Sequence, residues 1–181
     1  MGFKPDQREL FNKYALEPGR VQALVLGSGT SALSAQLILS GLCSHVVSVD
    51  NEEECVRQMQ NRYADDSRFA TGTLQWLCAD LNDESEHGAA NLIKRGSFDL
   101  VLDKSTLDAM LCDDATGLLC TAAEALRCNG IYVIASLYGE RLLRKLLAES
   151  PLGAVDEARH AADEAHIAAC DAGESQTIAF R

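Results

Sequence analysis

Short apolar runs alternate with amphipathic stretches along the chain from residue 21 onward. Five runs are dominated by apolar residues: VQALVL (21–26), HVVSV (45–49), TLQWLCA (73–79), FDLVL (98–102) and IYVIASL (131–137). The runs are largely continuous rather than alternating in polarity, which is typical of strands with both faces buried. The pattern therefore predicts five buried strands separated by helices.

Helical stretches fill the intervals between the predicted strands. They reach from the turn after residue 26 to about Ser40, then cover 51–63, about 114–128 with Asn129-Gly130 as a stop signal, and 139–150. Strands and helices that alternate in this way build βαβ units with a parallel sheet. We expect an α/β fold, a single doubly wound, Rossmann-like domain with a mostly parallel sheet.

The C-terminal part of the chain is less regular. Residues 166–180 read as an antiparallel hairpin around 172–174, whereas residues 154–161 fit a strand or a helix equally well. We therefore expect the sheet to end in a C-terminal antiparallel hairpin.

The composition narrows the classes of partner. The chain has 181 residues, which suits one domain, and its net charge is −11. No basic cluster has the size that nucleic acid binding requires. An acidic surface favours a basic protein or a cationic ligand, although the charge also serves solubility. No apolar run approaches the ~18 residues of a membrane span, and the first residues lack a signal peptide pattern. We expect a cytoplasmic protein that binds neither nucleic acid nor membrane.

The seven cysteines form no CxxC pair, and no histidine lies at ligand spacing near them, so no metal site is predicted. Cys112, Cys120 and Cys128 recur every eight residues, which corresponds to one face of a helix. We interpret these three as small core residues, and the thiols of the chain as reduced.

Three successive predicted strands lead into an aspartate: Asp50, Asp80 and Asp103. The carboxyl ends of parallel strands meet at one edge of a sheet, where ligands bind near the switch in strand order. One such aspartate is ordinary, because helix N-caps favour Asp. Three in succession beside a glycine turn indicate a binding site at this edge.

The glycine turn is GSGTSA (27–32), directly after the first predicted strand. Its glycines allow a sharp turn and close ligand approach, and Asp50, about 20 residues on, suits ribose hydroxyls. This spacing favours an adenosine-type cofactor without choosing between a dinucleotide and S-adenosylmethionine; a tight turn without a ligand is the alternative. Asp80 is placed to accept a hydrogen bond from an adenine amino group. A dehydrogenase is disfavoured because the chain has no Tyr-x-x-x-Lys pair and few residues follow the fifth strand.

Four segments resemble those of class I, seven-stranded S-adenosylmethionine-dependent methyltransferases: VQALVLGSGTS, VVSVDN, WLCAD and FDLVLDKSTLDAM. The last is similar to the FD-x-V-x-DKGTLDA motif of the methyltransferase-like group that methylates lysines, or the N-terminus, of proteins. The resemblance covers about residues 21–139. It implies a single methyltransferase domain over 1–181, with a short N-terminal lid segment (1–20) and a catalytic core (21–181).

The resemblance also implies which residues contact the cofactor, S-adenosyl-L-methionine. Carried over to this sequence, they are Gly27, Ser28, Gly29, Thr30, Asp50, Asn51, Ala79, Asp80, Leu81, Asp103 and Lys104.

Two aspartates of the DKSTLDA segment are the candidate catalytic residues. The methyl group of the cofactor is already activated, so the protein has to align an unprotonated nucleophile with it. A carboxylate could orient an incoming amine by hydrogen bonding, which makes Asp103 the first candidate and Asp108 the second. The alternatives are a helix or turn cap for Asp103, and an N-cap or a salt bridge with Lys104 for Asp108.

Ser105 stands where the DKGTLDA motif has glycine, a residue that often marks a positive φ or a close backbone approach. The function that the resemblance implies is methyl transfer to a protein amine, with lysine as the expected acceptor, on a substrate that could be basic. Methylation of a small molecule and a non-catalytic binding role remain alternatives.

Overall fold

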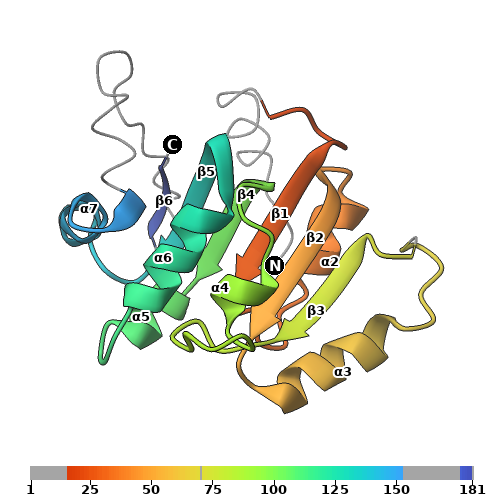
Figure 1. The fold of residues 1–181 in the computed structure, drawn as a ribbon. Coiled ribbons are helices and arrows are strands. Elements are labelled where there is room, and N and C mark those ends of the chain that lie inside the picture. Colours follow the sequence, from red (N-terminus) through yellow and green to blue (C-terminus); the bar gives the residue numbers. More distant parts are fainter. Residues whose placement is uncertain (1–15, 70, 153–175, 181) are drawn as a thin grey trace.

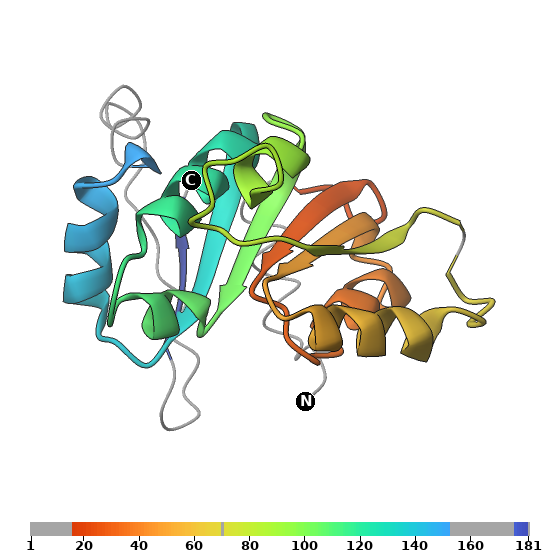
Figure 2. The ribbon, with the colours of Figure 1, turned by 60° about the horizontal axis from the view of Figure 1, so that its bottom comes forward.

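A single open sheet forms the centre of the molecule in the computed structural model, which describes residues 16–69, 71–152 and 176–180 (Figures 1 and 2). Within these residues the strand order is β3-β2-β1-β4-β5-β6. The strands are β1 (Val21–Leu26), β2 (Cys43–Asp50), β3 (Leu74–Cys78), β4 (Phe98–Lys104), β5 (Leu126–Ser136) and β6 (Gln176–Phe180). The pairings from β3 to β5 are parallel, and β6 is antiparallel to β5. The predicted α/β fold with a mostly parallel sheet is confirmed.

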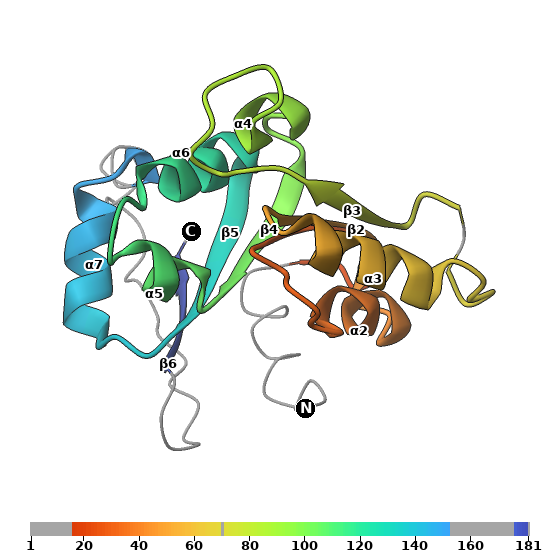
Figure 3. The same cartoon turned by 90° about the horizontal axis from the view of Figure 1, so that it is seen from below.

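Helices cover both faces of this sheet. They are α2 (Leu33–Leu39), α3 (Glu53–Tyr63), α4 (Ala89–Leu92), α5 (Thr106–Met110), α6 (Thr116–Ala125) and α7 (Glu140–Ala148). Figure 3 shows α2 and α3 on one side of the sheet, and α4 and α6 on the other. Residues of α5, α6 and α7 share one buried cluster with β1 and β4, which places these helices on the second face.

Strand β1 shows why the strands are continuous apolar runs. Val21, Ala23 and Val25 pack in the cluster that includes α2, whereas Leu24 and Leu26 pack in the cluster on the opposite face. All five are at most 2% exposed. Because successive side chains point to opposite faces, a strand covered on both sides needs apolar residues at every position.

The boundary between α6 and β5 differs from the prediction. The helix ends at Ala125, and β5 begins at Leu126, so the predicted helix as far as Cys128 was wrong. Asn129 has a φ of 67°, but it lies inside the strand rather than after a helix. Phe98 pairs with Leu126, and the next regular pair joins Leu100 to Ile131, so this segment is an irregularity of the ladder. A residue with positive φ indicates a local change of direction, and here it occurs within a strand.

The interpretation of three cysteines as core residues was also wrong. Cys112 and Cys128 are exposed and Cys120 is only partly buried. The eight-residue spacing had assumed one continuous helix. In the structure, Cys112 precedes α6 and Cys128 lies in β5, so the three do not share a helix face.

Three sequence predictions fall wholly or partly outside the described residues. The N-terminal lid lies there as far as residue 15, the element at 154–161 lies there entirely, and so does the first part of the C-terminal hairpin. The last part of the predicted hairpin is β6, which pairs antiparallel with β5, and the hairpin itself stays a prediction. Within the described parts of the chain, no helix has the length and apolar character needed to cross a membrane.

Candidate cofactor and active site

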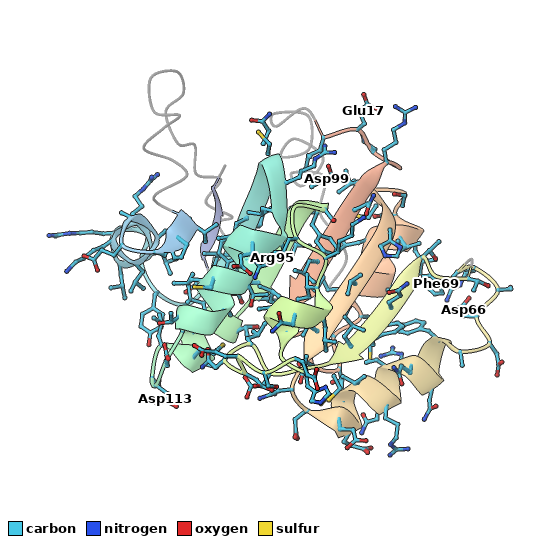
Figure 4. All side chains as sticks on the ribbon, viewed as in Figure 1. Glu17, Asp66, Phe69, Arg95, Asp99 and Asp113 are labelled. Carbon is cyan, nitrogen blue, oxygen red and sulfur yellow. The ribbon has the colours of Figure 1, made fainter. Side chains whose placement is uncertain are left out.

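A cavity of about 530 Å³ lies at the carboxyl edge of the sheet, where β1 and β4 adjoin. This is the point where the strand order reverses, the usual ligand position in doubly wound sheets. The volume is within the range of small-molecule and cofactor sites. The described residues that line it are Gly27, Asp50, Asn51, Ala79, Asp80, Leu81, Asn82, Lys104, Ser105, Thr106, Ala109, Met110, Asp113 and Asp114. Figure 4 shows Asp113 in the loop between α5 and α6, at this end of the sheet.

The turn after β1 depends on glycine at position 27. Gly27 has a φ of 60°, and a Cβ there would overlap the side chain of Thr106. The Thr106 hydroxyl donates to the Leu26 carbonyl oxygen at 2.9 Å, so α5 packs directly on the glycine turn. The missing side chain of Gly27 is therefore needed for this close approach.

Asp50 holds the glycine turn in place. Its Oδ2 accepts a hydrogen bond from the Gly29 amide at 2.6 Å, and its Oδ1 accepts one from the Glu52 amide at 3.0 Å. A carboxylate has about four acceptor positions, so these two bonds leave about two for a ligand. Because Asp50 lines the cavity, those positions can serve ligand hydroxyl groups.

The segment after β3 forms the opposite wall. Ala79 and Leu81 are buried apolar residues, at 6% and 8% exposed. Between them, Asp80 accepts a hydrogen bond from the Asn82 amide through Oδ1 at 2.8 Å. The wall thus combines apolar contact with one carboxylate, which suits a heterocyclic base carrying an amino group.

Asn82, which the sequence pattern did not single out, joins this wall to the start of α6. Its side chain accepts from the Gly117 amide at 3.1 Å and donates to the Asp114 carbonyl oxygen at 2.9 Å. A Cβ on Gly117 would overlap the Leu81 carbonyl oxygen. The sequence signal was weak: a polar residue two positions after a strand-end aspartate and a glycine at the beginning of a helix.

Four predicted cofactor residues do not line the cavity: Ser28, Gly29, Thr30 and Asp103. Ser28 is 5% exposed, and its hydroxyl has no hydrogen-bond partner among the described residues. Gly29 contributes indirectly through Asp50. The other predicted contacts are brought together around the cavity.

Asp103 is buried beneath the cavity and does not line it. Its carboxylate accepts from the amides of Thr106 at 2.8 Å and Leu107 at 3.0 Å, and from the Tyr132 hydroxyl at 3.2 Å. Burial raises the pKa of Asp103 to about 6, against the opposing effect of these hydrogen bonds. The first two bonds satisfy amide groups at the start of α5, which is the cap arrangement left open by the sequence.

Asp108 does not line the cavity either, and its partners belong to the end of β5. Oδ1 accepts a hydrogen bond from the Ser136 hydroxyl, and Oδ2 accepts one from the Leu137 amide at 2.8 Å. Asp108 forms no recorded ion pair with Lys104 within the described chain. The alternative of such a salt bridge is therefore not what the structure shows.

Ser105 lies in the cavity lining with φ 66° and ψ 6°, in the left-handed region. This backbone conformation favours glycine, the residue that the DKGTLDA motif has here. Its amide donates to the Ala135 carbonyl oxygen at 2.9 Å, which holds the segment against β5.

The fold and the cavity define a doubly wound α/β protein with a site suited to a nucleoside cofactor at the carboxyl edge of its sheet. The sequence model of the family described as "Methyltransferase domain" matches residues 20–176. The chain belongs to this family, which confirms the predicted resemblance.

Two curated relatives are similar over parts of their length. EEF1A lysine methyltransferase 4 of Mus musculus is 44% identical over 88 residues, which are 49% of this chain and 29% of that protein. The eEF1A lysine and N-terminal methyltransferase of Xenopus laevis is 32% identical over 145 residues, which are 76% of this chain and 19% of that protein. The chain therefore spans less than a third of the length of these relatives.

Solved structures confirm the fold. A TehB-like SAM-dependent methyltransferase from Corynebacterium glutamicum matches with a TM-score of 0.60 over 92% of this chain and 82% of that chain, at 15% identity. A SAM-dependent methyltransferase from Clostridium acetobutylicum matches with a TM-score of 0.55 over 71% of this chain and 47% of that chain, at 17% identity.

Proposed function

We propose that this domain binds S-adenosylmethionine in the cavity and transfers its methyl group to a protein lysine. The observation that carries the proposal is one cavity in which a positive-φ glycine turn and the strand-end carboxylates of β2 and β3 converge, in a chain of the methyltransferase family. The names of the curated relatives supply the acceptor class, since both are described as lysine methyltransferases of eEF1A.

The residues around the cavity fit the proposed cofactor. Asp50 has carboxylate acceptor positions left for ribose hydroxyls, and Asp80 with Leu81 would hold the adenine. Gly27 lines the cavity, and its missing side chain lets Thr106 of α5 pack against the glycine turn. Lys104 is the only cationic side chain among the described lining residues, so it would face the carboxylate of the cofactor.

When bound, S-adenosylmethionine supplies a methyl group that is already activated on a sulfonium, so the protein contributes mainly alignment and exclusion of water. Among the residues that the structure describes, four aspartates line the cavity against a single lysine: Asp50, Asp80, Asp113 and Asp114. This negative lining would attract the cationic side chain of a substrate lysine.

A basic protein substrate agrees with the net charge of −11. We also propose a cytoplasmic location, because the cysteines in the described part of the chain are free thiols, as suits a reducing compartment.

Binding of S-adenosylhomocysteine, measured by isothermal titration calorimetry, is the direct test of the cofactor. We expect wild type to bind it and Asp50→Ala to lose at least about 100-fold in affinity, because both the ribose contact and the support of the glycine turn are removed. Glu53→Ala, an exposed acid near the start of α3, is the matched control and should bind normally. Binding of NADH in place of S-adenosylhomocysteine would refute the proposal.

The acceptor is tested with labelled methyl donor added to an extract of the source cells. Label in protein bands, mapped to lysine by mass spectrometry, is the expected result. Label confined to a metabolite fraction would favour a small-molecule acceptor instead, and binding without any transfer would favour the non-catalytic alternative.

A further inference from the structure

Helix α5 forms one wall of the cavity but is too short to hold itself in place. It has five residues, Thr106–Met110, and isolated helices need roughly 12–15 residues to be even marginally stable in water. Thr106, Ala109 and Met110 of this helix line the cavity, together with Ser105 directly before it. The position of this wall must therefore come from contacts with other elements.

Asp103 supplies the first anchor, which joins α5 to β4. Its carboxylate binds the amides of Thr106 and Leu107, two of the orphan donors at the start of the helix. Tyr132 of β5 donates its hydroxyl to the same carboxylate at 3.2 Å. Tyr132 is fully buried, and burial raises its pKa well above the ordinary value of 10.0, so its hydroxyl keeps the proton that it donates.

Asp108, a residue of α5 itself, supplies the second anchor. It binds the hydroxyl of Ser136 and the amide of Leu137, at the end of β5. Ser136 is fully buried, so this contact is held inside the protein. The two aspartates of the DKSTLDA segment thus tie α5 to the two neighbouring strands β4 and β5.

The anchored helix in turn contacts the glycine turn of the cofactor cavity. Thr106 donates to the Leu26 carbonyl oxygen and occupies the space that a side chain on Gly27 would need. A shift of α5 would therefore disturb both the wall and the turn.

We infer that Asp103 and Asp108 are positioning residues of the proposed methyl transfer, which fix α5 as a cavity wall, and that neither meets the acceptor amine. The inference rests on the proposed function. Two observations carry it: the carboxylates are engaged with donors from α5 and β5, and neither carboxylate lines the cavity among the described residues.

The two roles differ in how the conservative variant behaves. Asn at position 103 keeps an acceptor for the amides of α5, and its amide group can donate to the Tyr132 oxygen. If Asp103 is a positioning residue, Asp103→Asn should retain turnover within about 10-fold. Asp103→Ala should lose about 100-fold in turnover, which is the loss expected when a wall of the site is displaced by about 1 Å. A carboxylate that binds the amine directly would make both variants lose about 100-fold or more. Equal losses would overturn the inference.

Tyr132→Phe tests the same role without altering the carboxylate. Loss of one hydrogen bond should lower turnover by about 2–10-fold, although Tyr132 does not line the cavity. Combined with Asp103→Ala it should add little, because both changes break one anchor. Tyr63→Phe, at the end of α3 where Tyr63 stacks on Trp76 of β3, is the matched control and should leave turnover unchanged. If the double variant instead lost turnover by the full product of the two single-variant factors, Asp103 and Tyr132 would not belong to one shared anchor.

Amide hydrogen exchange separates this inference from the proposed function, since it needs no turnover. In Asp103→Ala and in Tyr132→Phe, the amides of Thr106 and Leu107 should exchange at least about 10-fold faster, while core amides of β1 stay protected. Ser136→Ala should likewise speed exchange of the Leu137 amide. Unchanged exchange of these amides would refute the anchoring role, whether or not the wild type transfers methyl groups.

Discussion

Strand β4 carries a buried aspartate at each end, and the two carboxylates are held differently. Asp99 and Asp103 are 3% and 2% exposed. Asp99, at the end remote from the cavity (Figure 4), accepts from the Gln22 amide at 2.8 Å and forms an ion pair with Arg127. The Arg127 contact is an ion pair without the alignment of a hydrogen bond. Asp103, at the cavity end, has only neutral donors among the described residues.

The comparison shows that the charge of the partner, rather than burial or residue type, separates the two ends. The charge of Asp99 is compensated by a guanidinium. The charge of Asp103 is not, and burial raises its pKa to about 6 even though several hydrogen bonds favour the carboxylate. Buried groups with shifted pKa values are typical of functional sites, and here the uncompensated charge lies next to the candidate cofactor site.

The largest expected difference between the ends is in the pH dependence of stability. The folded pKa of about 6 lies above the ordinary 3.8, so the folded protein binds the Asp103 proton more tightly than the unfolded chain does. The contribution of Asp103 to the free energy of unfolding is therefore fully present below about pH 4 and falls by about 3 kcal/mol as the pH rises through 6. Urea unfolding of the wild type and of Asp103→Asn, measured from pH 4 to pH 8, gives the free energy of unfolding of each protein. The difference between the two free energies should change by this amount across the pH range.

Asp99→Asn serves as the control at the other end of the strand. It should destabilise the protein at neutral pH, because it removes an ion pair, whereas Asp103→Asn should be neutral or stabilising there. If the free energy of unfolding depended on pH in the same way in both variants, the contrast between Asp99 and Asp103 would be contradicted.

A smaller effect is expected from removing the cation at the remote end. Arg127→Ala leaves the buried Asp99 carboxylate uncompensated and should lower the free energy of unfolding by about 2 kcal/mol. This is less than for a fully buried pair, because the Arg127 side chain is 55% exposed. Affinity for S-adenosylhomocysteine should stay unchanged, since Arg127 is far from the cavity.

The exposed pair between Arg95 and Glu124 provides the control for this variant. Their side chains are 67% and 38% exposed, so Arg95→Ala should cost well under about 1 kcal/mol. An equal loss in both variants would mean that burial of Asp99 has no energetic consequence.

The smallest expected effect concerns Ser105, at the cavity end of β4. Its φ of 66° strains a residue with a side chain, so Ser105→Gly should raise the free energy of unfolding by about 1 kcal/mol. Asn129→Gly, at the other described non-glycine residue with positive φ, should gain less, because Asn tolerates this region better. Thermal unfolding of both variants makes the comparison, and a loss of stability in Ser105→Gly would show that the serine side chain contributes more than its strain costs.

Local patterns predicted the elements and the position of the cavity well. The strand-end positions of Asp50 and Asp80, and the glycine turn at 27–29, follow from short runs that each belong to one strand and its loop. The boundary at Leu126 was missed because helix propensity and strand pairing compete there, and pairing with Phe98 prevailed. Asn82 was missed because its partners, in the region of Asp114 and Gly117, are more than 30 residues away.

The sequence by itself determined the α/β class, the family and the edge of the sheet at which the cavity lies, because burial periodicity and strand-end chemistry are local properties of the chain. Only the tertiary structure decided what Asp103 and Asp108 do. A carboxylate at a strand end can meet a ligand or satisfy amides, and the choice depends on which donors other strands bring within about 3 Å. Here Tyr132 and Ser136 of β5 bring those donors, and no pattern within DKSTLDA could reveal them.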